Sequence, residues 1–538
     1  MRRVARYQSW EPYCQSSCPL GNKIRDWLQL VKQRRTKEAW ELLVSRNPFP
    51  SIMGRICYHF CESGCRRGLD DQAVAISQVE RWLGDQAIMH GWSLPAPLVD
   101  RRDYALRSSL KILVVGAGPA GLSAAYQLAR LGYQVVVWEK NHYLGGELQR
   151  TLPSYRLPAD VAQRELMRVA DYPGVQVLLD KSFTKLAEVR EQFAAVLLAT
   201  GAGVDRQLNL PSVGTWPTLP MSYFLERVNV GSFLPNLGHR LIVYGGGNSA
   251  VDAARVAKRL AVEEVIIVYH RSQECMPAFG EELTAALAEG IKLVTLRSIV
   301  QIEHNGVRLQ INTLDENLKP LATGEYEFLQ ADSLIMALGQ QPDLALYDDL
   351  DRAGSFLVAD DRGRSSGIGV WAIGDLVGGS RNASTAIASG RLAAEDVHSW
   401  LSYPHDEKQI SNDWFRTDGE RVVDETVSGN EHLVCPERCA QGTAARVSLK
   451  AVGPELAVQS LQEVVGTIDD LEAIQESERC YSCGSCRGCG NCAASCPKAV
   501  IALDDLGYLK TIDEENCIGC GRCVRNCPCG VLHRVDDV

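Results

Sequence analysis

Short runs of apolar residues alternate with helical patterns through the middle of this chain. Residues 111–115, Lys-Ile-Leu-Val-Val, have the composition of a buried strand, and the apolar positions of residues 122–131 recur at helical spacing. Further apolar runs follow at residues 135–138 and 195–198. Strands that alternate with helices in this way predict doubly wound parallel sheets, so we expect an α/β fold.

The beginning of this pattern occurs twice. Residues 240–244, Arg-Leu-Ile-Val-Tyr, resemble residues 111–115, and a glycine follows each run. Two similar starts in one chain predict two Rossmann-like nucleotide-binding domains, the second inserted into the first.

Changes in composition divide the chain into five expected domains. They are a helical domain at 1–105, a first nucleotide-binding domain at 106–235 and 331–400, a second nucleotide-binding domain at 236–330, a polar connector at 401–470 and a cysteine-rich α+β domain at 471–538.

The first glycine-rich turn has the spacing of a dinucleotide-binding loop. Its glycines give a tight turn and let backbone N–H groups approach a pyrophosphate at the start of the following helix. Glu139 ends the next strand, 18 residues after Gly121, where it would meet a ribose 2′-hydroxyl. The expected contacts here are Gly116, Gly118, Pro119, Ala120, Gly121, Glu139 and Lys140.

The second turn repeats this spacing with alanine in the third position, which the motif accepts. The expected contacts here are Gly245, Gly247, Asn248, Ser249, Ala250 and Asp252. After the next strand come His270 and Arg271 instead of an acid. A basic group suits the 2′-phosphate of NADP, whereas an acid would bind the ribose of NAD. The sequence therefore favours NADP and leaves NAD open.

Charge and hydropathy narrow the class of protein. A net charge of −10 over 538 residues argues against nucleic acid as a partner. No run approaches the roughly 18 apolar residues of a membrane span. The basic residues at 1–6 have no apolar stretch behind them, so we expect no secretory signal and a cytoplasmic location.

The 19 cysteines gather at the two ends of the chain, five before residue 66 and eleven after residue 479. Closely spaced CxxC pairs without a signal peptide indicate metal ligation and not disulfides. Two CxxCxxCxxxCP runs match a bacterial ferredoxin with two [4Fe-4S] clusters, in which the fourth cysteine of each run ligates the other cluster. The doubled run disfavours zinc. The expected ligand sets are Cys486, Cys489, Cys492 and Cys527, and Cys517, Cys520, Cys523 and Cys496.

The N-terminal cysteines lie in recognisable motifs. Cys14-x3-Cys18-Pro19, Gly54-Arg55-Ile56-Cys57 and Cys61-Glu62-x2-Cys65 resemble the small subunit of glutamate synthase. They also resemble the N-terminal part of dihydropyrimidine dehydrogenase and the large subunit of NADH-dependent ferredoxin:NADP oxidoreductase. The motifs at 155–158 and 276–278 fit the same superfamily, and the resemblance covers about residues 11–400.

The resemblance implies that the first nucleotide is FAD. Asp375, in Gly374-Asp375, would hydrogen-bond its ribityl chain, although a surface aspartate after a strand is the plainer alternative. The further contacts it implies around the nucleotides are Gly146, Ala199, Thr200, Gly201, Gly339, Gly374, Asp375 and Ala386.

The resemblance also implies two [4Fe-4S] clusters in the N-terminal domain. One would use Cys18, Cys57, Cys61 and Glu80, where Glu80 as a surface acid is the alternative. The other would need Cys14, Cys65 and an upstream CxxC pair, but Arg6 and Ser9 occupy those two places.

A CxxC pair in a similar context occurs at Cys480 and Cys483. We hypothesise that this pair joins Cys14 and Cys65 around one cluster; alternatively, the cluster is lost and the pair is a spectator. Cys275 and Cys529 are expected to be free thiols, and two cysteines alone do not assign Cys435 and Cys439 to a metal.

These features predict an NAD(P)H-dependent oxidoreductase that moves electrons between NAD(P)H, FAD and [4Fe-4S] clusters, to or from ferredoxin or a partner enzyme. A second interpretation is an electron-transfer subunit in a hetero-oligomer, such as glutamate synthase or a 2-oxoacid:ferredoxin oxidoreductase. A third is a non-enzymatic electron-wire or scaffold protein, against which both intact nucleotide motifs argue. No arrangement of Ser, His and Asp suggests hydrolysis, and no catalytic side chain is assigned because the cofactors carry the chemistry.

Overall fold

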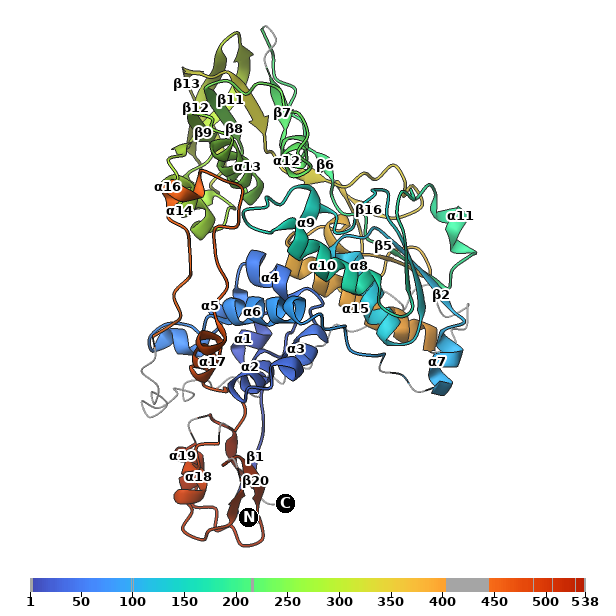
Figure 1. Cartoon of the computed structure of the whole chain (residues 1–538), viewed down its shortest axis with the longest axis vertical. Helices are drawn as coiled ribbons and strands as arrows, with labels where there is room; N and C mark the ends of the chain where they lie inside the picture. The colour runs from blue at the N-terminus through green and yellow to red at the C-terminus, as the bar shows by residue number, and fades with distance from the viewer. Residues whose placement is uncertain are drawn as a thin grey trace.

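The computed structural model describes residues 3–97, 99, 101–213, 217–402, 445–486, 488–505, 507–527 and 529–536. Cys435 and Cys439, which the sequence did not assign, lie outside them. Figure 1 shows an elongated molecule in which a helical domain lies between the two nucleotide-binding domains and a small C-terminal domain.

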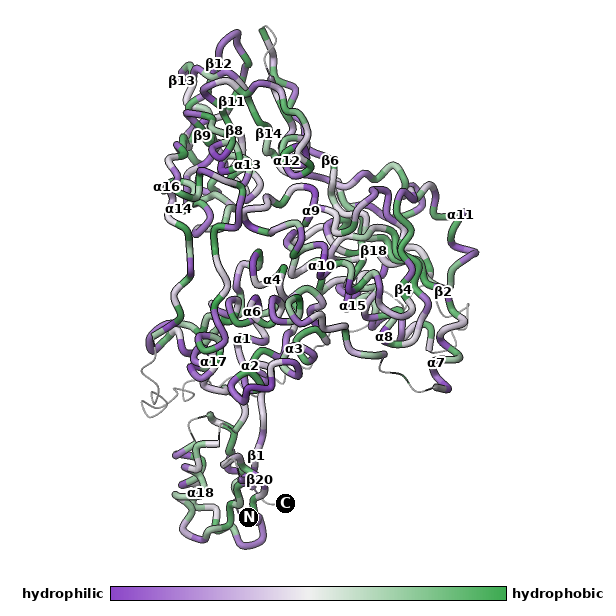
Figure 2. The backbone as a smooth tube through the Cα atoms, in the orientation of Figure 1, coloured by the Kyte–Doolittle hydropathy of each residue, from purple (hydrophilic) through white to green (hydrophobic). Residues whose placement is uncertain are grey.

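The first sheet has five parallel strands in the order β18-β5-β2-β3-β4. Their bounds are β2 (Lys111–Val115), β3 (Gln134–Trp138), β4 (Val175–Leu178), β5 (Ala195–Leu198) and β18 (Val370–Ala372). Helix α8 (Pro119–Arg130) packs along α15 (Ala383–Ser402), at the side of the sheet that faces the helical domain. The hydrophobic strands are visible in Figure 2. This doubly wound arrangement confirms the predicted α/β class. The smaller elements of this domain are α7 (Arg101–Arg107), α9 (Glu147–Arg150), α10 (Ala159–Ala170), α11 (Leu186–Arg190), β6 (Val204–Asp205), β15 (Gln340–Gln341), β16 (Arg352–Ala353), β17 (Phe356–Leu357) and the 3₁₀ turn η3 (Gly374–Leu376).

The second sheet is also parallel, in the order β10-β9-β8-β14-β7. It draws β7 (Thr218–Pro220) and β14 (Ser333–Met336) from outside the predicted limits of residues 236 and 330. The reason is that these strands have only three and four residues, and strands this short do not reveal which sheet they join. An antiparallel sheet, β11-β12-β13, is added to this domain. The other elements are β8 (Arg240–Tyr244), β9 (Glu264–Val268), β10 (Lys292–Val294), β11 (Arg297–Glu303), β12 (Gly306–Leu314), β13 (Pro320–Gln330), α12 (Met221–Asn229), α13 (Asn248–Arg259), α14 (Gly280–Ala288) and η2 (Gln273–Cys275).

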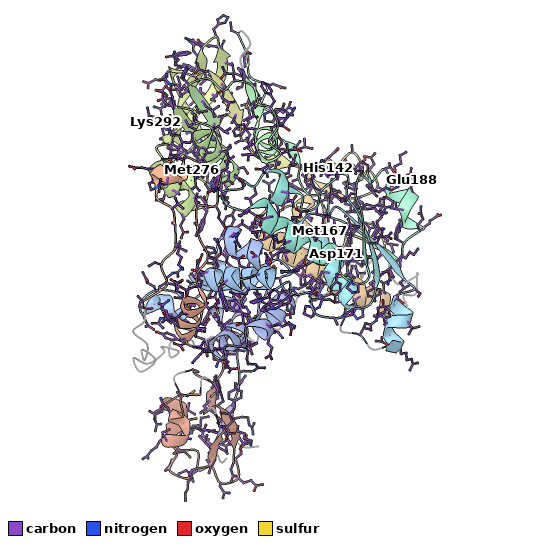
Figure 3. All side chains as sticks on the ribbon, viewed as in Figure 1. His142, Met167, Asp171, Glu188, Met276 and Lys292 are labelled. Atoms are coloured by element: carbon purple, nitrogen blue, oxygen red, sulfur yellow. The ribbon has the colours of Figure 1, made fainter. Side chains whose placement is uncertain are left out.

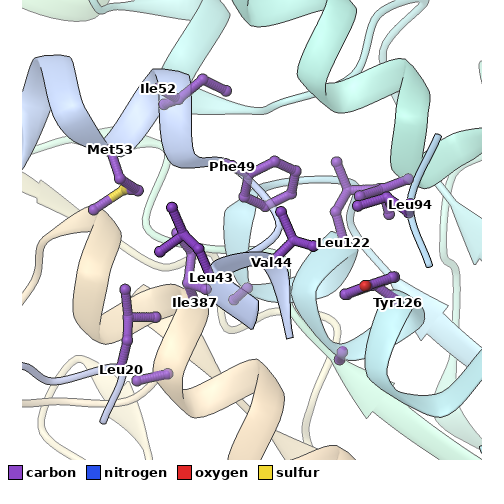
Figure 4. Packing of buried hydrophobic residues seen from close by; sticks show 14 of the residues in the cluster. Leu20, Leu43, Val44, Phe49, Ile52, Met53, Leu94, Leu122, Tyr126 and Ile387 are labelled. Carbon is purple, nitrogen blue, oxygen red and sulfur yellow. The ribbon is translucent and has the colours of Figure 1, made fainter. Parts of the chain in front are cut away.

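The N-terminal domain is helical, and its core continues into the first nucleotide-binding domain. Figure 4 shows Val44 and Phe49 of the helical domain beside Leu122 and Tyr126 of α8. Helices α4 and α6 approach so closely that a Cβ atom on Gly84 would lie 2.2 Å from the backbone nitrogen of Ser51. The helices are α1 (Tyr13–Ser16), α2 (Ile24–Lys32), α3 (Thr36–Val44), α4 (Pro50–Ile56), α5 (Phe60–Ser63), η1 (Arg66–Leu69) and α6 (Ile76–Met89). Among the described residues, no helix has the length and apolar character that crossing a membrane would require.

The C-terminal domain contains one strand from the other end of the chain. Strand β1 (Arg3–Tyr7) pairs antiparallel with β21 (Leu532–Asp536), so the expected boundary at residue 471 does not separate the two ends. Helix α17 (Asp470–Glu478) instead packs against α2 and α6 of the helical domain. The remaining elements are α18 (Asn491–Ala494), β19 (Ile501–Leu503), β20 (Leu509–Ile512) and α19 (Arg522–Arg525).

The described part of the connector, residues 445–469, forms a strap between the helical domain and the second nucleotide-binding domain (Figure 1). It carries α16 (Pro454–Ala457) and turns back on itself, with the backbone of Ala451 bridged to that of Val465. Glu463 binds Arg55 at 2.7 Å and Arg81 at 2.9 Å, and both arginines are buried. Leu461 and Val464 of the strap pack against the hydrophobic core of the second nucleotide-binding domain, so the strap contacts both domains.

A buried carboxylate joins the helical domain to the first nucleotide-binding domain. Glu165 of α10 is fully buried, and its two oxygens accept hydrogen bonds from the backbone N–H groups of Ser51 and Ile52 at 2.9 and 2.8 Å. These groups lie in the first turn of α4, where no backbone partner exists.

We expect Glu165→Ala to lower the free energy of unfolding by about 2 kcal/mol or more, because two buried N–H groups would lose their acceptor. Glu165→Gln should be intermediate, since its amide offers one acceptor only. Denaturant midpoints followed by circular dichroism measure the effect, with the exposed Gln163→Ala on the same helix as control. A Glu165→Ala midpoint equal to that of the control would contradict this role.

Candidate functional site

The first glycine-rich loop connects β2 to α8 and is held tightly at two positions. Gly116 has φ +107°, and a Cβ atom there would lie 2.4 Å from the carbonyl oxygen of Ala199. A Cβ atom on Gly121 would lie 2.0 Å from the oxygen of Gly116. Gly118, by contrast, faces open space. Pro119 begins α8 and no side chain caps the helix, so its free N–H groups and the space above Gly118 fit a pyrophosphate.

Glu139 lies at the carboxyl end of β3, beside this loop. Its Oε2 accepts from the N–H of Ala117 at 2.8 Å, and its Oε1 accepts from both nitrogens of Asn141 at 2.9 Å. The buried carboxylate is thereby fixed where a ribose would lie. The neighbouring Lys140 is exposed.

Distant segments meet at the same edge of the first sheet. Gly146 approaches Gly118, and a Cβ atom on Gly374 would lie 2.9 Å from the Cβ of Ala120. Thr200, after β5, shares a hydrogen bond of 2.7 Å with the hydroxyl of Tyr347. Gly201 faces open space, and Ala386 is buried in α15. Because the carboxyl ends of parallel strands form the ligand crevice in such folds, these residues fit one bound FAD.

Asp375 is placed in this crevice by η3. Burial raises the pKa of Asp375 to about 6, Arg381 opposes the shift and Glu147 adds to it. A carboxylate in this crevice can accept hydrogen bonds from a hydroxyl-rich chain, which fits the expected partner of Asp375.

The second glycine-rich loop connects β8 to α13 in the same manner. A Cβ atom on Gly245 would lie 2.2 Å from the oxygen of Ala337, whereas Gly247 and Gly339 face open space. Asn248 begins α13, and its Oδ1 accepts from the N–H of Phe279 at 2.8 Å. Ser249 is exposed and Ala250 is buried. The loop fits a second dinucleotide.

Asp252 was expected at the nucleotide, but its carboxylate faces the first domain. It accepts from the hydroxyl of Tyr155 at 2.9 Å and forms an ion pair with Arg156 at 2.9 Å. All three side chains are buried or nearly so. This pairing joins the two nucleotide-binding domains and accounts for Asp252 without a ligand. The motif at 155–158 is therefore an interdomain contact.

His270 and Arg271 follow β9. Burial and the neighbouring Arg271 lower the pKa of His270, so the positive charge at this position belongs to Arg271. Its guanidinium lies 5.6 Å from the centre of the Tyr269 ring, and its Nε is buried without a hydrogen-bond partner among the described residues. Met276 packs into the core of this domain (Figure 3).

The helical domain brings Cys18, Cys57, Cys61 and Glu80 together. Each thiol interacts electrostatically with Glu80, and Cys18 and Cys57 interact with each other. Burial raises the pKa of Cys18 to about 11 and that of Cys57 to about 12. Glu80 is itself buried and accepts from Asn47 at 2.8 Å. Glu80 is thus no surface acid, and the set fits a cluster that binds thiolates and a carboxylate.

The C-terminal domain forms two further thiol sets. Cys492 interacts with Cys486, Cys489 and Cys527. Cys496, Cys517, Cys520 and Cys523 line a small cavity, to which β1 contributes Ala5. In each set the fourth cysteine of one run lies with the first three of the other, as two adjacent [4Fe-4S] clusters require.

None of the described cysteines forms a disulfide, Cys275 and Cys529 included, and the thiol of Cys529 donates to the backbone oxygen of Tyr481 at 3.8 Å. No three His, Cys, Asp or Glu side chains among the described residues are arranged to hold a single ion. A [4Fe-4S] cluster spreads its four ligands over four iron atoms, so it requires wider spacing than zinc.

The sequence missed Tyr58, which follows Cys57. Its hydroxyl accepts from Asn248 Nδ2 at 2.6 Å, and its ring stacks on Phe279 at 5.3 Å between centres. Tyr58 thus joins the helical domain to the second nucleotide loop, a contact between distant segments for which no motif gives a signal.

Three family models match the chain. Residues 110–390 match the pyridine nucleotide-disulphide oxidoreductases, residues 6–92 match domain II of dihydropyrimidine dehydrogenase with its 4Fe-4S cluster, and residues 485–531 match the 4Fe-4S dicluster domain.

Two curated relatives cover most of the chain. The small chain of NADPH glutamate synthase from Azospirillum brasilense is 33% identical over 72% of this chain and 86% of its own length. Subunit beta of NADP(+)-dependent formate dehydrogenase from Moorella thermoacetica is 29% identical over 87% of this chain and 70% of its own length. Among solved structures, Mycobacterium tuberculosis FprA in complex with NADPH is 19% identical, with a TM-score of 0.47 over 55% of this chain and 85% of that one.

The matches agree with the two nucleotide loops and with cysteine sets at both ends. The chain belongs to the pyridine nucleotide-disulphide oxidoreductase family and is an NAD(P)H-linked flavin and iron–sulfur oxidoreductase related to the glutamate synthase small chain.

Proposed function

We propose that this chain passes electrons between NADPH and a protein partner through its C-terminal ferredoxin domain. The observation that carries the proposal is the contact of Tyr58 with Asn248. It places the thiol set of Cys57 beside the second nucleotide loop. The nucleotide sites and the iron–sulfur ligands therefore belong to one continuous structure.

The residues of the chain bind and orient, and the cofactors supply the chemistry. Hydride transfer between nicotinamide and flavin, and single-electron transfer by iron–sulfur clusters, need no protein nucleophile. The glycine loops would hold the two pyrophosphates, Glu139 would hold the FAD ribose, and the buried thiols would hold the clusters. The Asp252–Arg156 ion pair fixes the two nucleotide-binding domains relative to each other.

NADPH is favoured over NADH by Arg271. Among the described residues its buried Nε has no hydrogen-bond partner, and a buried donor without an acceptor is costly unless a ligand satisfies it. A 2′-phosphate would do so with a charge-assisted hydrogen bond. Neutral His270 adds no charge of its own.

We expect NADPH to bleach the flavin of the anaerobic protein, and Arg271→Ala to weaken NADPH about 10-fold to 100-fold, because one charge-assisted hydrogen bond is worth about 1.5–3 kcal/mol. NADH binding should change by less than twofold. Stopped-flow reduction at varied nucleotide concentration gives both dissociation constants. Equal losses for NADPH and NADH would contradict the role of Arg271, and no bleaching by either nucleotide would favour a scaffold.

A partner enzyme is the second part of the proposal. Two relatives that each cover more than two thirds of the chain are named as a small chain and a beta subunit. We propose that this chain likewise joins a hetero-oligomer, with ferredoxin, a glutamate synthase large subunit or a 2-oxoacid:ferredoxin oxidoreductase as alternatives. A reducing compartment, the cytoplasm, would keep its many thiols available for clusters.

Anaerobic affinity purification of the chain from its own organism separates these alternatives. We expect a second subunit in stoichiometric amount that survives washing at high salt. Purification of the chain alone, with rapid NADPH-dependent reduction of added ferredoxin, would support the stand-alone oxidoreductase and contradict the hetero-oligomer.

A further inference from the structure

The two ends of the chain run side by side over a long distance. Beyond the β1–β21 ladder, the N–H of Gln8 donates to the oxygen of Val531 at 2.9 Å, and that of Trp10 donates to the oxygen of Gly484 at 3.0 Å. A Cβ atom on Gly484, which has φ +72°, would lie 2.1 Å from the oxygen of Trp10. This contact leads directly to Cys14 on one segment and Cys483 on the other.

The turn that holds Cys480 and Cys483 is fixed on the helical domain. Arg479 is buried, donates to the oxygen of Gln72 at 2.7 Å and pairs with Glu476 at 2.7 Å. Arg67 donates to the oxygen of Arg479 at 2.8 Å. Tyr481 donates to Asp70 at 2.8 Å. The three hydrogen bonds to Gln72, Arg67 and Asp70 join residues that lie 407 to 412 positions apart in the sequence. They hold the turn beside Cys65.

Four thiols meet at this junction. Cys14 interacts electrostatically with Cys65, Cys480 and Cys483, and Cys65 interacts with both members of the CxxC pair. Cys14, Cys65 and Cys480 pack against the same buried hydrophobic cluster, and Cys483 is half-buried. Four thiols gathered in one place, none of them in a disulfide, fit the ligands of one metal centre.

Basic groups surround the four sulfurs. Arg66 lies over the ring of Tyr13 at 4.3 Å, and Arg25 donates to the oxygen of Cys483 at 3.3 Å. Lys32 lies within electrostatic range of Cys480, and Arg25 and Arg66 lie within electrostatic range of Cys483. Four thiolates around a [4Fe-4S] core carry net negative charge, which these cations would offset.

We propose that Cys14, Cys65, Cys480 and Cys483 ligate one [4Fe-4S] cluster, shared between the two ends of the chain. Assembly replaces four S–H bonds with four Fe–S bonds and releases four protons. Cys480 and Cys483 lie outside both matched iron–sulfur segments, residues 6–92 and 485–531. The inference concerns cluster assembly and goes beyond the proposed function, since iron content is measured without nucleotide or partner.

The test removes ligands from each end of the full chain and counts iron and sulfide after anaerobic reconstitution. Four clusters predict about sixteen iron atoms in the unaltered chain. We expect Cys14→Ala/Cys65→Ala to lose about four, Cys480→Ala/Cys483→Ala to lose about four, and the quadruple variant to lose the same four. Cys275→Ala, which removes a thiol of the second nucleotide-binding domain, should lose none.

The quadruple variant is decisive because one shared site cannot be lost twice. Loss of about eight irons in that variant would place the two pairs in separate clusters and overturn the proposal. The proposal is also overturned if the Cys480→Ala/Cys483→Ala variant keeps all its iron. It is overturned as well if this double variant loses more than four irons, because the pair would then belong to the ferredoxin clusters.

Discussion

The antiparallel pairing of β1 with β21 is the contact on which the arrangement of the two ends depends. The cost in entropy of closing so long a loop grows only slowly with its length, so ends this far apart in sequence can meet once the domains between them are folded. The ion pairs that β1 makes, Arg3–Asp536 and Arg6–Glu514, are exposed, and exposed ion pairs contribute little to stability. The ladder therefore needs help from buried contacts nearer the helical domain.

Buried ion pairs make such contacts at the domain boundaries. Arg479 with Glu476 holds the CxxC turn, Asp252 with Arg156 holds the two nucleotide-binding domains, and Glu463 with Arg55 holds the strap. Such pairs add little net stability, because desolvation offsets the attraction, but breaking one leaves an uncompensated charge. They consequently favour one relative placement of the domains. Fixed placement is what electron transfer between bound cofactors requires.

The sequence predicted features that depend on local spacing. The glycines at 116–121 and 245–247 lie in tight turns at strand ends, and the ferredoxin cysteines group across their two runs as the spacing indicated. Contacts between distant segments left no local pattern. The membership of β7 and β14 in the second sheet, the pairing of Asp252 and the contact of Tyr58 with Asn248 each depend on residues far along the chain. The CxxC pair at Cys480 and Cys483 had only an indirect signal in the sequence, because the CxxC pair expected upstream of Cys14 is absent.

We propose that the nucleotide sites and the iron–sulfur ligands form one electron path within the chain. The most direct measurement is to reduce the full anaerobic protein completely with dithionite, remove the excess, and add an excess of NADP⁺ while recording electron paramagnetic resonance and absorbance. We predict that the signals of reduced [4Fe-4S] clusters decline as NADPH forms, with two electrons lost per NADPH. Cluster signals that persist while only the flavin is reoxidised would contradict the account.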